Sequence, residues 1–216
     1  MCPVFVTGGT GYVGRPLIEA LVAKGYAVHA LVRRGSEGKL APAAIPVVGD
    51  ALDESSYAAS IPPAATLVHL VGTPHPNPAK AAEFRRVDLV SIRAATVAAR
   101  SAGVHHLIYV SVAHPAPVMQ AYIAVRQEGE DLVRATGIPA TIVRPWYVLG
   151  PGHWWPYALL PFYALLRQLP ATRASAERLG LVTLAEMVAA LTRAVEKPST
   201  AGVRIVEVPA IRGVTR

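Results

Sequence analysis

The glycines between residues 7 and 14 have a spacing that supports phosphate binding, because they lie in the segment Thr-Gly-Gly-Thr-Gly-Tyr-Val-Gly. Gly8 permits a tight turn, Gly11 lets the backbone approach a pyrophosphate, and Gly14 lets a helix pack close to a strand. The N–H groups that open such a helix stabilise the phosphate charge. The pattern predicts a dinucleotide site, and the alternative is a glycine-rich turn alone. We expect three further loop residues to line the site: Thr10, Tyr12 and Val13.

Two arginines after the second apolar run of the chain bear on which dinucleotide this is. A site for NAD usually has Asp or Glu about 20 residues past the glycines, where it binds the ribose 2′-hydroxyl. Here Arg33 and Arg34 occupy that place. The segment Leu31–Ser36 contains no acidic residue, and the first one after it is Glu37. A guanidinium binds a 2′-phosphate with two hydrogen bonds, whereas a carboxylate repels it. The sequence therefore predicts NADP(H) in preference to NAD(H). The alternative is that one or both arginines form a solvated surface pair.

Apolar runs that alternate with helical segments must position these groups. Runs of strand type without polar alternation, separated by helices, indicate a parallel sheet covered on both faces. The expected strands are Pro3–Thr7, Tyr26–Arg33, Ile45–Val48, Thr66–Val71, His106–Val112, Ala140–Val143 and Val203–Val208. The expected helices are Pro16–Lys24, Asp53–Ser60, 79–102, Val118–Thr136 and one that begins at the capping-box spacing of Thr183 and Glu186.

This order predicts an α/β fold, a Rossmann-like doubly wound parallel sheet with helices on both faces and a small C-terminal cap. We expect a dinucleotide-binding domain at residues 1–152 and a substrate-side cap at 153–202. A strand at 203–208 then returns to the main sheet, so that all three parts form one structural unit. In the long helix 79–102, helical spacing predicts one apolar face: Val87, Val90, Ala94 and Val97.

Composition limits the class of protein. An apolar content of 52% with 16% charged residues excludes intrinsic disorder. The 21 basic against 14 acidic residues do not indicate nucleic-acid binding, because no run of five basic residues occurs. The single cysteine, Cys2, excludes a disulfide framework, and no ligand spacing predicts a metal site. No apolar stretch approaches the ~20 residues that span a membrane, and no signal peptide is apparent, so we expect a cytoplasmic protein without an integral membrane segment.

Further motifs give the chain a family resemblance. Beyond the glycine-rich loop, the motifs are Gly49-Asp50, Leu70-Val71-Gly72, Tyr109-Val110-Ser111, Arg144-Pro145 and Gly150-Pro151-Gly152. With them, residues 3 to about 152 resemble the short-chain dehydrogenase/reductase superfamily, specifically its atypical, NmrA-like and NAD(P)H-binding members, which are also similar to NAD-dependent epimerases and dehydratases.

The resemblance implies roles for residues at the ends of the strands. Asp50 and Ala51 would lie against the adenine, and Leu70, Val71 and Gly72 against its ribose. Pro145 and Trp146 would lie near the nicotinamide. Alternatives remain for two of these residues, since Asp50 also suits the cap of the next helix and Gly72 also suits a turn.

The resemblance also implies a catalytic set, from which this chain departs. The family uses Ser, Tyr and Lys; here Ser111 and Tyr122 are present, but Arg126 takes the lysine position. Tyr122 and Arg126 are four residues apart and share a helix face. A phenol with a pKa near 10 needs a nearby cation to act at neutral pH. Arginine supplies this charge and can hold a ribose hydroxyl, but it cannot relay a proton.

Three interpretations of this set stay open, because the interval between Ser111 and Tyr122 is short for the family. Tyr122 is a proton donor, or the set is a relic that binds cofactor without rapid turnover, or Tyr122 is an ordinary residue of an amphipathic helix. The first interpretation, with Tyr122 as proton donor, predicts an enzyme. The second predicts a non-catalytic NADP(H)-binding redox sensor resembling the NmrA regulators, or an accessory subunit resembling that of respiratory complex I.

Aromatic and histidine side chains gather in the two loops that follow the fifth and sixth strands. They are His114, Trp146, His153, Trp154 and Trp155. Ligands of open α/β sheets bind beyond the carboxyl ends of the strands, where these loops lie. An aromatic wall suits a small apolar or aromatic substrate, although Trp154-Trp155 also suits a packing or oligomer patch. We therefore expect an NADP(H)-dependent oxidoreductase that reduces an apolar carbonyl or quinone-type molecule, as a monomer or homodimer.

Overall fold

The computed structural model describes residues 1–151 and 178–213, and its centre is a parallel sheet of seven strands. The strand order is β3-β2-β1-β4-β5-β6-β9. The bounds are β1 Val4–Thr7, β2 Val28–Val32, β3 Ile45–Val48, β4 Thr66–His69, β5 His106–Val110, β6 Ala140–Arg144 and β9 Val203–Glu207. The first six strands have the order of doubly wound dinucleotide-binding sheets. The predicted Rossmann-like fold class is confirmed.

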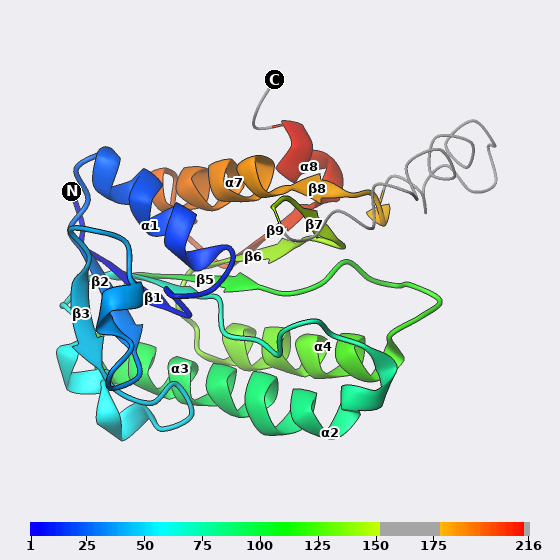
Figure 1. The fold of residues 1–216 in the computed structure, drawn as a ribbon, viewed down its shortest axis with the longest axis horizontal. Helices are drawn as coiled ribbons and strands as arrows, with labels where there is room; N and C mark the ends of the chain where they lie inside the picture. The colour runs from blue at the N-terminus through cyan, green and yellow to red at the C-terminus, as the bar shows by residue number, and fades with distance from the viewer. Residues whose placement is uncertain (152–177, 214–216) are drawn as a thin grey trace.

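Helices cover both faces of this sheet (Figure 1). On one face lie α1 Gly14–Ala23, α7 Leu184–Glu196 and α8 Val208–Arg212. On the other lie α3 Val90–Ser101 and α4 Gln120–Ala135, with the short α2 Ala81–Glu83 leading through a π-helical turn, η5 Phe84–Leu89, into α3. Four short 3-10 turns lie in the connections, η1 Glu37–Lys39, η2 Glu54–Ser56, η3 Ala58–Ser60 and η4 Pro78–Lys80. A separate ribbon pairs β7 Val148–Leu149 with β8 Val182–Thr183.

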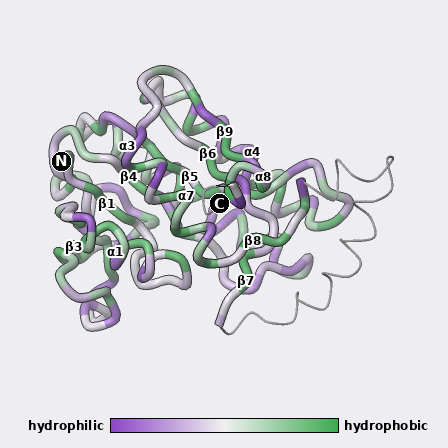
Figure 2. Tube along the Cα trace, turned by 90° about the horizontal axis from the view of Figure 1, so that it is seen from above, coloured by the Kyte–Doolittle hydropathy of each residue, from purple (hydrophilic) through white to green (hydrophobic). Residues whose placement is uncertain are grey.

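The strands divide their side chains between two hydrophobic cores. Val4 and Val6 of β1 pack toward α1 and α7, while Phe5 between them packs toward α3. All three are fully buried, as expected for a strand covered on both faces. Seen from above in Figure 2, the hydrophobic residues follow the strands and helices that cross the middle of the molecule. This two-sided burial holds the carboxyl ends of the central strands in a fixed register.

The predicted apolar face of the helix at 79–102 is confirmed only in part, since Ala94 is buried and Val87 half-buried. Val90 and Val97 are 38% and 45% exposed, and the buried stripe includes Asp88 and Ile92 instead. The buried residues of α3 that follow helical spacing are Ile92, Ala95 and Ala99. Directly before them, Asp88 within the π turn η5 is also buried.

Other helices follow their sequence patterns more closely. The capping box is confirmed, since Thr183 Oγ1 accepts from Glu186 N at 3.1 Å and Thr183 N donates to Glu186 Oε2 at 2.7 Å. The segment expected to be a short helix from Asp53 forms the two 3-10 turns η2 and η3 instead, although Asp53 caps the first of them as expected. Among the residues that the structure describes, no helix is long and apolar enough to cross a membrane.

Candidate functional site

A pocket of about 470 Å³ lies at the carboxyl ends of β1, β2 and β4, where the strand order reverses. Such a switch point is the place where open α/β sheets bind ligands. The pocket brings together most of the residues predicted from sequence to bind cofactor. They are Gly8, Thr10, Gly11, Arg33, Asp50, Ala51, Leu70, Val71 and Gly72. Leu31, Val32, Leu52, Pro74, Glu83 and Val87 complete its lining with Gly49.

The glycine-rich loop leaves space that side chains would fill. Gly8 has φ +79°, and a Cβ there would lie 2.9 Å from the carbonyl carbon of Leu70. A Cβ on Gly14 would overlap the carbonyl oxygen of Gly8, so α1 can begin close to β1 only with glycine at that position. The Gly11 amide donates to Gly8 O at 3.0 Å and closes the turn. These features fit the pyrophosphate of a dinucleotide. Of the other loop residues, Tyr12 places its hydroxyl against Gly150, and Val13 packs beside the α1 core.

The two arginines after β2 differ in position. Arg33 lines the pocket, and Arg34 is exposed and is absent from its lining. Backbone N–H groups of Glu37 itself and of Gly35 lower the pKa of the Glu37 carboxyl, and the charge of Arg34 lowers it further. Both arginine side chains are exposed, but of the two only Arg33 belongs to the pocket lining.

Asp50 lines the pocket, and its Oδ1 accepts a hydrogen bond from the Leu52 amide at 2.9 Å. The cap of the next helical turn is Asp53, so the alternative of a helix cap is wrong for Asp50. The amide of Asp50 itself donates to Ser56 Oγ at 2.9 Å. The carboxylate is therefore held at the wall of the pocket by its own turn.

A buried ion pair lies directly behind the pocket wall at Gly72. Arg126 Nη2 donates to Asp88 Oδ1 at 2.7 Å, with side chains 6% and 0% exposed. Arg126 Nη1 donates to the carbonyl of Val110, the last residue of β5, at 3.0 Å. The other Asp88 oxygen accepts from both the amide and the hydroxyl of Thr73, at 3.0 and 2.6 Å. The pair therefore connects α4, η5, β5 and the segment after β4.

Tyr122 packs between two side chains. Its ring centroid is 4.9 Å from that of Phe84, and the guanidinium carbon of Arg126 lies 5.1 Å from the Tyr122 centroid. The structure thus brings Tyr122 and Arg126 together, as the four-residue spacing predicts. Arg126 also lies 5.8 Å from the ring centroid of Tyr109, whose pKa is raised by burial to about 12.

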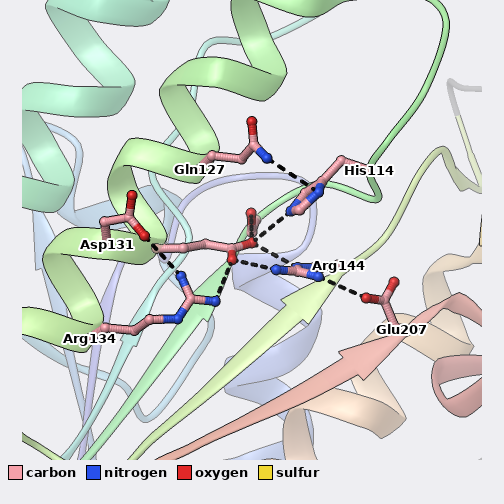
Figure 3. A network of polar contacts seen from close by, with 8 residues as sticks. His114, Gln127, Asp131, Arg134, Arg144 and Glu207 are labelled. Atoms are coloured by element: carbon pink, nitrogen blue, oxygen red, sulfur yellow. Dashed lines mark hydrogen bonds and ion pairs between the residues drawn. The ribbon is translucent and has the colours of Figure 1, made fainter.

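Ser111 points to a different partner, the buried carboxylate of Glu130. Its Oγ donates to Glu130 Oε1 at 2.7 Å, so the serine and Tyr122 make separate contacts. Arg144 donates to both oxygens of Glu130 and, through Nη1, to Glu207 at 2.9 Å. Arg134 approaches the carboxylate from the other side, as Figure 3 shows. Burial alone would raise the pKa of Glu130, but hydrogen bonds from Arg144 and Ser111 outweigh it and the pKa lies below its ordinary value.

The predicted substrate residues are only partly within the described chain. His114 is mostly buried, with Nε2 3.5 Å from Glu130 Oε1. Trp146 lies edge-on to Tyr147, their centroids 5.5 Å apart, and the carbonyl of Pro145 accepts from the Ala113 amide at 2.8 Å. His153, Trp154 and Trp155 lie outside the described residues. In the described ranges 1–151 and 178–213, no cluster of His, Cys, Asp and Glu suits a metal ion.

A larger groove, of about 930 Å³, lies between α1 and α7, and none of the predicted site residues within the described ranges lines it. Its walls are mostly apolar, with Lys24 and Glu196 forming an ion pair at one end. We place the functional site in the smaller pocket, because that pocket lies at the switch point and contains the glycine-rich loop.

Sequence reasoning missed two buried acids of the site, Asp88 and Glu130. A signal for Glu130 was available. It lies four residues after Arg126 and three before the buried Val133, so charged residues occupy inward positions of α4. Charged side chains at inward positions indicate partners in the interior. Asp88 lies within the π turn η5, and it too takes an inward position.

Comparison with known proteins agrees with this geometry. The sequence model of the NAD(P)H-binding family matches residues 8–151. A ceramide reductase of Caulobacter vibrioides is 35% identical over 156 residues, which cover 69% of this chain and 47% of the relative. A 4-hydroxy-2-methyl-3-oxo-4-farnesyl-3,4-dihydroquinoline-1-oxide ketoreductase of Stigmatella aurantiaca is 30% identical over 168 residues, covering 68% and 50%. The chain spans about half the length of these relatives.

Solved structures show the same fold. A short-chain dehydrogenase/reductase superfamily protein from Agrobacterium tumefaciens with bound NAD has a TM-score of 0.69 and 21% identity, over 94% of this chain and 77% of that chain. The enzyme WbmH of Bordetella bronchiseptica, in complex with NAD+, has a TM-score of 0.70 and 19% identity, over 96% and 75%.

Proposed function

Because this chain belongs to the NAD(P)H-binding family, in the atypical part of the short-chain dehydrogenase/reductase superfamily, we propose that it is an NADP(H)-dependent oxidoreductase that reduces an apolar carbonyl or quinone-type molecule. The observation that carries the proposal is the pocket at the strand switch point, lined by the glycine-rich loop and by Arg33. The reductase names of the relatives support the reaction class.

Preference for NADP(H) follows from the end of β2. Arg33 faces the pocket, and its guanidinium suits a 2′-phosphate. The strand end Leu31-Val32-Arg33 contains no carboxylate that would bind a ribose 2′-hydroxyl in its place.

The nicotinamide supplies the hydride, and the chain supplies orientation and a proton. We assign the proton donor to Tyr122, because Phe84 and Arg126 fix its ring from two sides. The charge of Arg126 stabilises the phenolate that remains after the proton has left. Ser111 directly follows β5, and its hydroxyl, which donates to Glu130 here, has to leave that partner before it can donate to a substrate carbonyl oxygen.

The proposed substrate class rests on the relatives and on the loops after β5 and β6. Two relatives are named for reduction of a ceramide and of a farnesylated quinoline oxide, both lipophilic molecules. In this chain Trp146 follows β6, and His114 follows β5. An aromatic and weakly charged wall fits an apolar substrate better than a sugar nucleotide.

One observation favours a second function, a non-catalytic NADP(H)-binding redox sensor or accessory subunit. Arg126, which stands where the family has its lysine, has both terminal nitrogens bound to Asp88 and Val110. It cannot give up a proton. A chain with this feature can bind cofactor without rapid turnover.

The experiment that separates the two functions is NADPH consumption against a panel of quinones and aldehydes. For an enzyme with Tyr122 as proton donor, Tyr122→Phe should reduce turnover by about 10²-fold or more. Tyr26→Phe makes the same chemical change beside the α1 core and should leave turnover unchanged. Turnover that survives Tyr122→Phe would overturn the assignment of the proton donor. Tight NADPH binding without turnover on any acceptor would favour the sensor.

A further inference from the structure

The contact between η5 and α4 has a regular pattern, in which two residues four apart on one element meet two residues four apart on the other. Phe84 packs on Tyr122, and Asp88 pairs with Arg126. Phe84 and Asp88 both lie in the π turn η5 and are both buried. Single π turns occur often at functional sites. The match therefore sets the positions of Tyr122 and Arg126 together.

The same contact reaches the wall of the cofactor pocket. Asp88 Oδ2 holds the amide and the hydroxyl of Thr73, the residue between two pocket-lining residues, Gly72 and Pro74. A Cβ at Gly72 would overlap Arg126 Nη2, so the guanidinium lies directly against the outer side of this wall. Asp88 thus holds the pocket wall at Thr73 through Oδ2, and through Oδ1 it holds Arg126, which lies against that wall.

We propose that Asp88 is a positioning residue of the cofactor pocket, and that Arg126 supports the pocket wall from behind instead of binding the cofactor ribose. This inference rests on the proposed function for the identity of the ligand. It replaces the role in which Arg126 holds a ribose hydroxyl. Both terminal nitrogens of Arg126 have partners within the protein, at 2.7 and 3.0 Å, and its side chain is 6% exposed.

Removal of the Asp88 or the Arg126 charge alone leaves the other charge buried without its partner. The proposal is therefore tested with single and double variants of this pair. Asp88→Asn and Arg126→Met are measured singly and together in the full chain, by NADPH and NADH titration of intrinsic fluorescence and by thermal unfolding. We expect each single variant to bind both dinucleotides at least 10-fold more weakly. The double variant should bind more tightly than either single variant, because no uncompensated charge remains. The ratio of NADPH to NADH affinity should not change, since Arg33 lies elsewhere in the pocket.

Asp131→Asn is the matched control. Asp131 lies on the same helix, α4, and its side chain is 79% exposed and pairs with Arg134 at 3.2 Å. This variant should bind both dinucleotides as the wild type does. It makes the same change from carboxylate to amide away from the pocket.

Four other outcomes overturn the inference. If Arg126 binds the ribose, Arg126→Met and the double variant lose affinity equally and Asp88→Asn has little effect. If the pair only stabilises the fold, Asp88→Asn lowers the unfolding temperature while the dissociation constants, measured well below it, stay at wild-type values. If the wild type binds neither dinucleotide, both the proposed function and this inference fail. If the wild type binds and Asp88→Asn has the same affinity as the wild type, this inference alone is overturned.

Discussion

Replacement of Glu130 by glutamine should destabilise the protein more than any other single change from carboxylate to amide on α4. The Glu130 carboxylate is 2% exposed and accepts four hydrogen bonds, from Ser111, Arg134 and twice from Arg144. An amide keeps the shape but removes the charge and places an NH₂ group against cationic donors.

The expected loss in the free energy of unfolding depends on which ion pairs Arg144 and Arg134 keep in the variant. Breaking a buried ion pair by changing one partner costs about 3–5 kcal/mol. Here Arg144 keeps Glu207 at 2.9 Å and Arg134 keeps Asp131 at 3.2 Å. We therefore expect the lower end, about 3 kcal/mol. For a chain of this length, that corresponds to a decrease in Tm of about 6–12 °C.

Thermal unfolding followed by circular dichroism measures the effect, with Glu128→Gln as the control. Glu128 is 44% exposed, and its ion pairs with Arg85 and Arg93 are 3.8 and 3.7 Å long. Surface pairs of this kind contribute about 0–1 kcal/mol, so the control should change Tm by less than about 4 °C. Equal Tm values for Glu130→Gln and Glu128→Gln would refute the reasoning.

The same carboxylate gives a pH dependence with a definite sign. Its pKa in the folded protein lies below the ordinary value, so the ionised form contributes stability in full above the unfolded pKa of about 4.3. That contribution is lost as the pH falls through the lowered folded pKa. The Tm difference between wild type and Glu130→Gln should therefore be largest near neutral pH and shrink below about pH 4. A difference that grows in acid would contradict the assignment.

Three further predictions concern the pocket. Arg33→Ala should weaken NADPH binding by about 10-fold or more and leave NADH binding nearly unchanged, because a hydrogen bond to a charged group contributes about 1.5–3 kcal/mol. Arg34→Ala should change the affinity for neither dinucleotide. If fluorescence titration of Arg33→Ala shows equal losses for NADPH and NADH, the 2′-phosphate argument is refuted. Gly14→Ala places a Cβ on a backbone oxygen, so it should cost about 1–3 kcal/mol in urea unfolding and weaken both dinucleotides, and a variant as stable as wild type would disprove it. Gly72→Ala should displace Arg126 and weaken both dinucleotides with their affinity ratio unchanged, a result that titration can contradict by showing wild-type affinity.

The strands and the glycine-rich loop could be predicted from sequence, because local pattern determines them. The strand Val4–Thr7 begins with three apolar residues and is buried at every position, as a strand covered on both faces requires, and glycines follow it directly. The predicted end residues of the strands were less accurate. Thr66–Val71 was expected, but β4 ends at His69, since Leu70 and Val71 already belong to the pocket lining.

The partners of the site residues could not be predicted, because they come from distant parts of the chain. Asp88 is 38 residues from Arg126, and Glu130 is 19 from Ser111. A regular helical count also misplaced part of the inward face of α3, where Ile92, Ala95 and Ala99 are buried while Val90 and Val97 are exposed. The predicted roles of Ser111 and Tyr122 in catalysis stay predictions, as does the division into a domain and a cap.

The position of β9 has a consequence for synthesis of the chain on the ribosome. β9 pairs with β6 along its whole length, from Ala140 with Val203 to Arg144 with Glu207. The open edge of β6 therefore waits for its partner while about 60 further residues are translated, which takes about 3–12 s at typical rates of ~5–20 residues per second. An open strand edge is a template for pairing with other chains. A nascent chain that stalls in this interval would present that edge to its neighbours, so slow codons between β6 and β9 should lower the yield of soluble protein.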